Sequence, residues 1–269
     1  MPKLILVTVG TSALERCRNT NYYPDLDQLV DKLNKKGDSS QCYNNVKVQV
    51  TERLQSNIER YLDGREPDYR RLSAETASLL AMHKDQNIGK ITSEDKIVLL
   101  YSDTVDGKLS AEVNAKVICE TLMKCTDMIP EVIESEDGKD VVTIFKSSSA
   151  SREIIQMVRL VGLQHQNAHC FVEKGLTNLF ARTKKLLEDH CPPEWQRFVN
   201  ITGGYKGEIP IQTLQAELKK VPIVYLFEYA ELVKMNFTDD GVEIWGPNQP
   251  TPTATFSISR RMEEIESIK

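Results

Sequence analysis

The sequence has 269 residues, of which 40% are hydrophobic and 27% charged, enough for one large domain or one domain with a modest appendage. No segment approaches the roughly 18 consecutive apolar residues of a membrane helix, and the N-terminus lacks the layout of a secretory signal, so we expect a cytoplasmic protein with no membrane partner. The net charge of -5, with Lys and Arg spread along the chain, argues against long DNA or RNA as the ligand.

The N-terminal part predicts a buried strand and two helices. Lys3–Val9 is a nearly continuous apolar run ended by Gly10, as expected of a central strand covered on both faces. Residues 46–62 have helical spacing of apolar positions. Residues 73–82 predict a second helix, with Ser73 as its N-cap.

The middle of the chain predicts a second strand at 96–101, which runs into the polar loop 102–107 and then a helix over 109–124. A third strand is expected within 129–134. The stretch 135–151 is polar and rich in serine apart from the short apolar run 141–145, and its structure stays open.

The C-terminal half predicts a helix at 173–189, a strand at 197–201, a helix at 206–220 and a buried strand at Ile223–Phe227. This alternation predicts an α/β, Rossmann-like, mainly parallel sheet with helices on both faces. We assign residues 1–235 to one ligand-binding domain. Residues 236–269 form a short appendage, with a hairpin at 237–246, a linker at 247–255 and a short helix at 257–269, and could be a dimerisation arm or the stump of an effector domain.

Three polar loops follow predicted strands, and in open parallel sheets ligands bind at the carboxyl ends of strands. The pair Gly203-Gly204 lets the backbone approach a ligand, the next helix offers free N–H groups to a phosphate, and Lys206 adds a positive charge. A plain strand-to-helix turn with a solvated lysine is the alternative. The candidate ligand-binding residues are Gly10, Thr11, Ser12, Ala13, Ser102, Asp103, Thr104, Asp106, Gly107, Thr202, Gly203, Gly204, Tyr205 and Lys206.

Familiar cofactor and hydrolase motifs are absent. The chain has neither GxGxxG after its first strand nor GxxxxGK[ST], which disfavours ordinary NAD or ATP binding, and it has no GxSxG elbow. Its six cysteines form no CxxC pair, so we expect no disulfides, metal or cofactor. Arg159 and His165 fit an R-x5-H ribonuclease spacing, and His165, His169 and Cys170 loosely suggest a metal site, but such short patterns also arise by chance.

An ordered set of segments resembles the CARF domains of type III CRISPR systems, specifically the APE-type subfamily. In chain order the segments are LVTVGTS at 6–12, LSAE at 72–75, VLLYSDT at 98–104, GKLSAE at 107–112, EKGLTNL at 173–179 and NITGGYK at 200–206, followed by Ile209-Pro210. The likeness spans roughly residues 3–235. The stretches 20–46 and 135–166 depart from the pattern, and no nuclease domain follows residue 235.

The resemblance implies a homodimer that binds a cyclic oligoadenylate, most often the tetra-adenylate, across its two-fold axis. In similar ring nucleases the positions of Ser12 and Lys206 form the catalytic pair, which cuts the ring without a metal into linear products with a 2′,3′-cyclic phosphate. With no histidine in view as general base, we expect slow cutting. Two alternatives stay open: a binding-only regulatory domain of a larger effector, and a Rossmann enzyme for an ordinary nucleotide cofactor.

Overall fold

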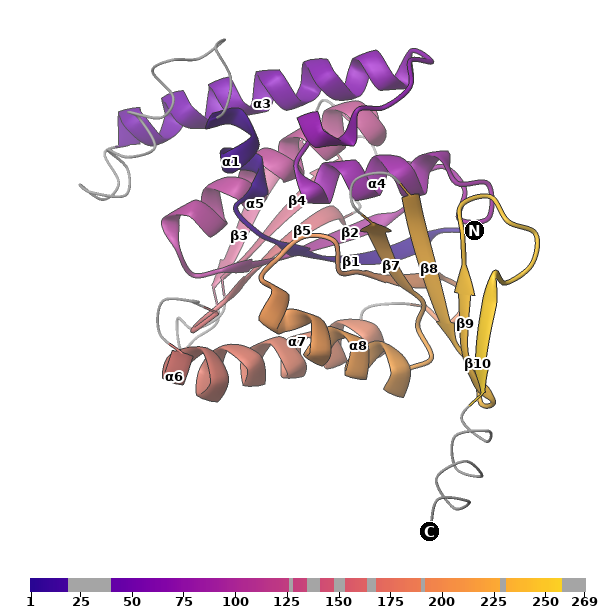
Figure 1. The fold of residues 1–269 in the computed structure, drawn as a ribbon. Helices are drawn as coiled ribbons and strands as arrows, with labels where there is room; N and C mark the ends of the chain where they lie inside the picture. Colours follow the sequence, from indigo (N-terminus) through magenta and orange to yellow (C-terminus); the bar gives the residue numbers. More distant parts are fainter. Residues whose placement is uncertain are drawn as a thin grey trace.

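The computed structural model describes residues 1–18, 40–125, 128–134, 141–147, 153–163, 168–189, 192–227 and 231–257 (Figure 1). Ten strands form one sheet in the order β10-β9-β8-β7-β6-β1-β2-β5-β4-β3. The strands are β1 (Lys3–Val9), β2 (Lys96–Ser102), β3 (Met128–Glu134), β4 (Val141–Ser147), β5 (Glu153–Leu160), β6 (Gln196–Asn200), β7 (Ile223–Phe227), β8 (Glu231–Phe237), β9 (Gly241–Trp245) and β10 (Ala254–Ser257).

The five strands β7, β6, β1, β2 and β5 are parallel to one another, and antiparallel strands flank them on both sides. β4 and β3 extend the sheet beyond β5, and β8, β9 and β10 extend it beyond β7. The expected Rossmann-like fold with a mainly parallel core is confirmed.

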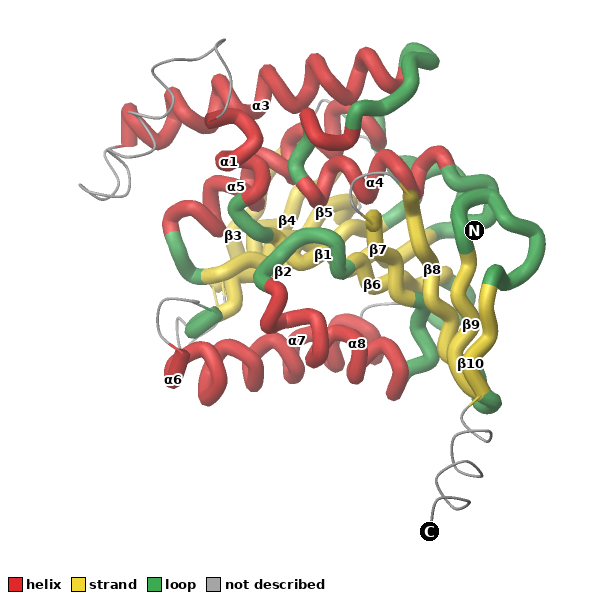
Figure 2. Tube along the Cα trace, viewed as in Figure 1, coloured by secondary structure: helices red, strands yellow, loops and turns green. Residues whose placement is uncertain are grey.

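Helices cover both faces of the sheet (Figures 1 and 2). One face carries α1 (Ser12–Arg18), α3 (Ser40–Leu62), α4 (Ala74–Lys84) and α5 (Val105–Val117), which continues as a π-helical turn at Ile118–Leu122. The other face carries α7 (Leu176–Asp189) and α8 (Ile209–Leu218). Short turns η1 (Tyr69–Arg71), α6 (Ala168–Cys170), η3 (Phe171–Gly175) and η4 (Lys206–Glu208) complete the described elements. No helix in these ranges is both long and apolar enough to cross a membrane.

The sequence of β1 explains its central place. All seven of its residues are buried, and they alternate between two cores. Ile5 and Val7 belong to the core beneath α3, α4 and α5, whereas Leu4 and Leu6 belong to the core beneath α7 and α8. A strand that serves two cores needs apolar residues on both faces, which is the pattern of a central parallel strand.

Helix α4 is buried over nearly its whole length. Ser73 caps it, because the Ser73 hydroxyl accepts the Thr76 N–H at 3.0 Å, as the sequence predicted. Leu79, Leu80 and Met82 are fully buried in the core, so replacing one of them by alanine should cost about 2–5 kcal/mol. The position of α4 against β1 is therefore strongly fixed.

The middle region differs from the prediction. The strand expected at 129–134 exists as β3, but it is an antiparallel strand at the sheet edge, paired with β4. The third parallel strand is β5, which the sequence analysis missed. Gln156 and Arg159 interrupt the apolar run of β5, and this weakens the pattern typical of a buried strand.

The C-terminal segment continues the sheet. A hairpin of β8 and β9 is present, but its first strand begins at Glu231, six residues before the range 237–246 in which we expected the hairpin. β8 also runs across residue 235, where we placed the domain boundary. The segment expected as a linker is held by hydrogen bonds: Asn248 N–H donates to Asp85 at 3.0 Å, and the Asn87 side chain donates to Gln249 O at 2.9 Å. The expected helix at 257–269 lies outside the described residues, apart from Ser257, which ends β10.

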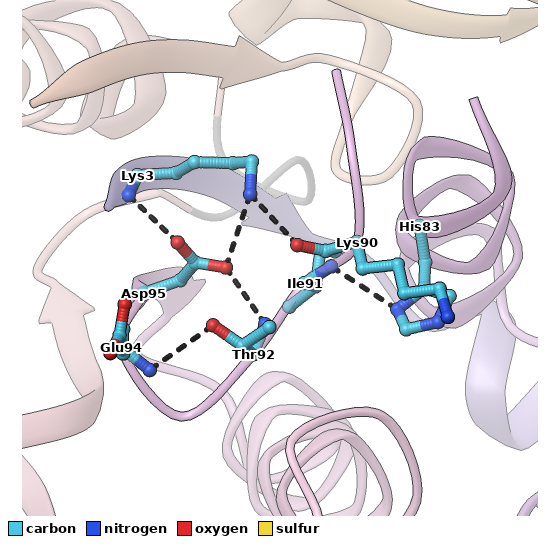
Figure 3. Close-up of polar contacts among 7 residues, drawn as sticks. All are labelled: Lys3, His83, Lys90, Ile91, Thr92, Glu94 and Asp95. Carbon is cyan, nitrogen blue, oxygen red and sulfur yellow. Dashed lines mark hydrogen bonds and ion pairs between the residues drawn. The ribbon is translucent and has the colours of Figure 1, made fainter. Parts of the chain in front are cut away.

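At the amino edge of the parallel strands, the carboxylate of Asp95 is held by three donors (Figure 3). It accepts the Lys3 N–H at 2.8 Å and the Thr92 N–H at 2.8 Å, and the Lys3 ammonium lies 3.4 Å from its second oxygen. The same ammonium donates to Lys90 O at 2.8 Å. Both Lys3 and Asp95 are buried, so this ion pair ties β1 to the start of β2.

The order of the strands creates a switch point beside β1. From β1 the chain moves to β2 and β5 on one side, and then returns to place β6 and β7 on the other side. The segments that leave the carboxyl ends of β1 and β6 therefore go to opposite faces of the sheet, since α1 lies on one face and α8 on the other. Such a point is where open α/β sheets bind their ligands.

Candidate functional site

The loops after β1 and β6 meet at the switch point. Gly10 lies against Gly204 so closely that a methyl group on Gly10 would come within 3.1 Å of Gly204 N. Two residues before Gly10, the Thr8 hydroxyl donates to Gly203 O at 2.8 Å. The two predicted loops therefore form one continuous backbone surface.

Glu75, in the first turn of α4, lies beneath this surface and binds the β1 loop. Its carboxylate accepts the Gly10 N–H at 2.7 Å through one oxygen and the Ser12 hydroxyl at 2.9 Å through the other. The side chain is completely buried, and burial raises the pKa of the Glu75 carboxyl, while the bonds from Gly10 and Ser12 lower it by less. A fully buried carboxyl thus determines where the β1 loop lies.

The Ser12 hydroxyl makes two hydrogen bonds within the protein. It donates its only proton to Glu75 and accepts the Ala74 N–H at 3.0 Å. A hydroxyl has one proton and two lone pairs, so one lone pair of Ser12 remains for a ligand. Ser12 is partly exposed.

The two glycines of the β6 loop are required by space. A methyl group on Gly203 would overlap the Glu75 carboxylate and lie 2.5 Å from Thr8 O. Gly204 has φ +84°, in the left-handed region that favours glycine, and a methyl group there would lie 2.7 Å from the Glu208 carboxylate. The loop is therefore compressed between two acidic side chains.

Glu208 is the second buried carboxyl, placed by η4. One oxygen accepts the Tyr205 N–H at 3.1 Å, and the other has no hydrogen-bond partner within the residues that the structure describes. Burial, and to a smaller extent the nearby negative charge of Glu75, raise the pKa of Glu208 to about 8, against the lowering effect of the Tyr205 N–H. Glu208 is therefore largely protonated at neutral pH.

The loop after β2 lies at the same edge of the sheet, since Val9 pairs with Tyr101. Several of its polar groups, however, make hydrogen bonds within the protein. The hydroxyls of Ser102 and Thr104 lie 2.8 Å apart, and Thr104 caps α5 by accepting the Gly107 N–H at 3.0 Å. Asp103 accepts the Gly162 N–H at 3.1 Å, which ties this loop to the end of β5. Asp106 lies in the first turn of α5.

The remaining predicted residues divide into exposed and structural ones. Tyr205 and Lys206 are exposed, and within the described ranges the side chain of Lys206 makes no hydrogen bond or ion pair. Thr202 accepts the Leu226 N–H at 3.0 Å, so its hydroxyl serves the sheet. Thr11 donates to Glu15 at 2.7 Å, and Ala13 is completely buried.

A hollow of about 560 Å³ lies where β5 ends beside α7. Its lining carries an excess of positive charge, with Arg159, Lys174, Arg182 and Lys185 against the single carboxylate Glu173. The segment before α7 also reaches the β6 loop, because the rings of Phe171 and Tyr205 meet edge to face at 5.3 Å. The short segment η3 therefore lines the hollow through Glu173 and Lys174 and contacts the β6 loop through Phe171.

The other patterns in the sequence gain no support. Among the described residues, no three His, Cys, Asp or Glu side chains form a group that could hold a metal ion. Of the R-x5-H pair, Arg159 lies in β5 and His165 lies outside the described residues. His169 pairs with Glu173 on the surface at 3.1 Å.

Glu75, Glu208 and Phe171 are residues of this site that the sequence analysis did not single out for it. One signal was present for Glu75: it is the only ionisable residue in the run 73–82, whose other residues are small or apolar. A lone carboxyl in a helix that is buried all round must have a specific partner. Glu208 carried no comparable signal, because it follows the polar loop residues Tyr205, Lys206 and Gly207, which give no indication of burial.

Comparison with known proteins gives one family. Residues 70–235, more than half of the chain, match the model of the CRISPR-associated protein (Cas_APE2256) family. The matched range includes Glu75, the β2 loop, α7 and the whole β6 loop. No curated protein matches the chain. With this coverage, the chain belongs to the CRISPR-associated protein (Cas_APE2256) family.

Proposed function

We propose that this protein binds a cyclic oligoadenylate, with the cyclic tetra-adenylate as first candidate, and cleaves it slowly without a metal. The observation that carries the proposal is the contact between Gly10 and Gly204 at the switch point, with Lys206 exposed beside it. Backbone that close to the surface can approach phosphates directly, and a lysine there supplies the matching charge. The family membership supports a role in CRISPR defence.

The ligand follows from charge and symmetry. The basic hollow at Lys174, Arg182 and Lys185 is connected to the β6 loop through η3, and its charge favours a ligand with several phosphates. A ring of four nucleotides has two-fold symmetry, so a homodimer can present the same set of loops to each half. A second subunit would complete the site.

The proposed cleavage needs positioning and charge stabilisation. A ribose 2′-hydroxyl attacks the neighbouring phosphorus in line with the departing 5′-oxygen, and the product keeps a 2′,3′-cyclic phosphate. Lys206 stabilises the charge that grows on the phosphoryl oxygens, and Ser12 positions the attacking ribose. Both residues thus touch the reacting groups.

The test is incubation of the protein with radiolabelled cyclic tetra-adenylate in EDTA, under single-turnover conditions. We expect linear products with a cyclic phosphate end. Lys206→Ala should slow cleavage by about 10²- to 10³-fold while it weakens binding much less, because the developing charge exists mainly in the transition state. The matched control is Lys219→Ala, since Lys219 is paired with Glu188 at the far end of α8. An intact ring after hours would remove the catalytic half of the proposal.

One observation favours a second candidate, a binding-only regulatory domain. The Ser12 proton is already donated to Glu75, so Ser12 cannot donate to a ligand without giving up that bond. Tight binding of the ring with no product would establish this candidate. Failure to bind rings of three, four or six adenylates would exclude both.

A further inference from the structure

The hydroxyl of Ser12 is a donor toward Glu75 and an acceptor toward Ala74. Its proton goes to Glu75, at 2.9 Å, and one lone pair accepts the Ala74 N–H. The lone pair that remains can accept a hydrogen bond from a ligand hydroxyl, but the residue has no second proton to give. A ligand O–H that reaches Ser12 would therefore join a chain that runs from the ligand, through Ser12, to a carboxylate.

Glu75 can take part in chemistry only through such a chain. It is completely buried, so it cannot touch a ligand, and its two oxygens face Gly10 and Ser12. Ser12, by contrast, is partly exposed. The Ser12 hydroxyl is thus the connection between this carboxyl and the surface.

We infer that Glu75 is a positioning residue that takes up the proton of the attacking ribose hydroxyl through the hydroxyl of Ser12. The inference rests on the proposed function and supplies the base that the sequence analysis could not find. The ribose 2′-O–H bond breaks as the bond from that oxygen to phosphorus forms. Ser12 receives this proton as its own passes to Glu75. The bond from phosphorus to the 5′-oxygen breaks, the 5′-oxygen takes a proton from water, and Glu75 later returns its proton to solvent.

The surroundings of Glu75 suit this role. The groups that face it from β1, from the N-terminus of α1 and from the N-cap of α4 are the Gly10 N–H and the hydroxyls of Ser12 and Ser73. The titratable neighbour is Glu208, which faces it from η4 and is largely neutral below about pH 8. Burial raises the pKa of Glu75, and a carboxylate with a raised pKa is a stronger base. The ionised form of Glu75 is the active one. Because the pKa is raised, acidification protonates Glu75 at a higher pH than an ordinary glutamate.

The deciding experiment measures single-turnover cleavage of labelled cyclic tetra-adenylate in EDTA as a function of pH. In the unaltered protein the rate should fall tenfold per pH unit below the pKa of Glu75. Glu75→Gln should lower the plateau rate by about 10²-fold and abolish this acid limb, while the Kd of the ring changes by less than about threefold. Glu75→Asp should restore part of the rate together with the acid limb.

Two further variants separate a proton-accepting role from a structural one. Asp95→Asn removes a buried carboxylate that also accepts backbone N–H groups, but at the amino edge of the sheet, and it should keep the acid limb. Ser12→Ala leaves the Gly10 bond to Glu75 in place and should lose the acid limb, so it decides the matter even if Glu75→Gln does not fold.

The outcomes distinguish the inference from the function on which it rests. If the unaltered protein does not cleave the ring, the proposed catalysis and this proton path fail together. If it does cleave, and Glu75→Gln or Ser12→Ala keeps the original acid limb, the proton path alone is wrong. Equal losses of binding and cleavage in Glu75→Gln would also overturn it, because Glu75 would then only hold the loop.

Discussion

At the amino edge of the parallel strands, the buried carboxylate of Asp95 lies beside the Lys3 ammonium, whereas at the carboxyl edge Glu75 and Glu208 accept only N–H and O–H donors from the described residues. Removing one partner of such a buried ion pair leaves a buried charge without its counterion and is strongly destabilising. Burial raises the pKa values of both Glu75 and Glu208, where no cation offsets it, and that of Glu208 reaches about 8. The same residue type is therefore structural at one edge and suited to chemistry at the other.

The largest effect should come from breaking the ion pair at the amino edge. Lys3→Met leaves the Asp95 charge buried with only its two N–H donors, and we expect a loss of about 3 kcal/mol in the free energy of unfolding. Denaturant unfolding measures it. The double variant Lys3→Met/Asp95→Asn should recover more than half of the loss, and no recovery would mean that the charge is not the cause.

Glycine at the carboxyl edge should matter more than glycine at the amino edge. Gly204 and Gly89 both have positive φ, at +84° and +79°, but a methyl group on Gly204 meets Glu208 and Thr8, whereas one on Gly89 meets nothing within 4 Å. Gly89→Ala should cost about 1 kcal/mol from backbone strain alone, and Gly204→Ala about 2–3 kcal/mol. Thermal unfolding compares the two, and equal losses would contradict the crowding of the β6 loop.

The pKa of Glu208 predicts a pH-dependent stability. The folded state holds this proton up to about pH 8, whereas the unfolded chain loses it near the ordinary value of 4.5. The stability from Glu208 is therefore fully present below about pH 4.5 and is lost as the pH rises toward 8, with a limit of about 1.4 kcal/mol per pH unit.

Glu208→Gln should remove this dependence. Since local relaxation reduces the limit, we expect the change in unfolding free energy between about pH 5 and pH 8 to be smaller than in the unaltered protein by about 1–2 kcal/mol. Asp95→Asn serves as the control at the other edge. Identical pH profiles for Glu208→Gln and the unaltered protein would mean that Glu208 is ionised throughout.

The smallest expected effect is a change in ligand affinity, and it distinguishes between the two hollows. The one at the carboxyl edge includes Arg182, and another of about 510 Å³ near the amino edge includes Lys90. If the ligand binds at the carboxyl edge, Arg182→Ala should weaken binding of cyclic tetra-adenylate about tenfold and reduce its dependence on salt. Lys90→Ala should leave both unchanged. Calorimetry at two salt concentrations tests this, and the reverse pattern would place the ligand at the amino edge.

Local patterns in the sequence predicted the central elements well. β1 and β7 were expected with the bounds they have, because a strand covered on both faces needs a continuous apolar run. Ser73 was expected as a helix cap, and it is one. The helix expected from residue 206 instead begins as the 3-10 turn η4, and α8 follows from Ile209.

The parts that the sequence did not reveal depend on contacts between distant residues. β5 was missed because Gln156 and Arg159 break its apolar pattern, and the order of the strands has no local signature. The loops at Gly10 and Gly203 were predicted as parts of one site, and the structure places them in contact. Glu75 lies 65 residues from Gly10 along the chain, so its role became visible only in the folded structure.

The parallel strands lie between two antiparallel margins, β4–β3 on one side and β8–β10 on the other. Neither outermost strand contributes a loop to the switch point. Lengthening, shortening or adding hairpins at either margin would therefore leave the geometry around Gly10 and Gly204 unchanged. The architecture separates the part of the chain in which insertions are tolerated from the part in which a single methyl group is not.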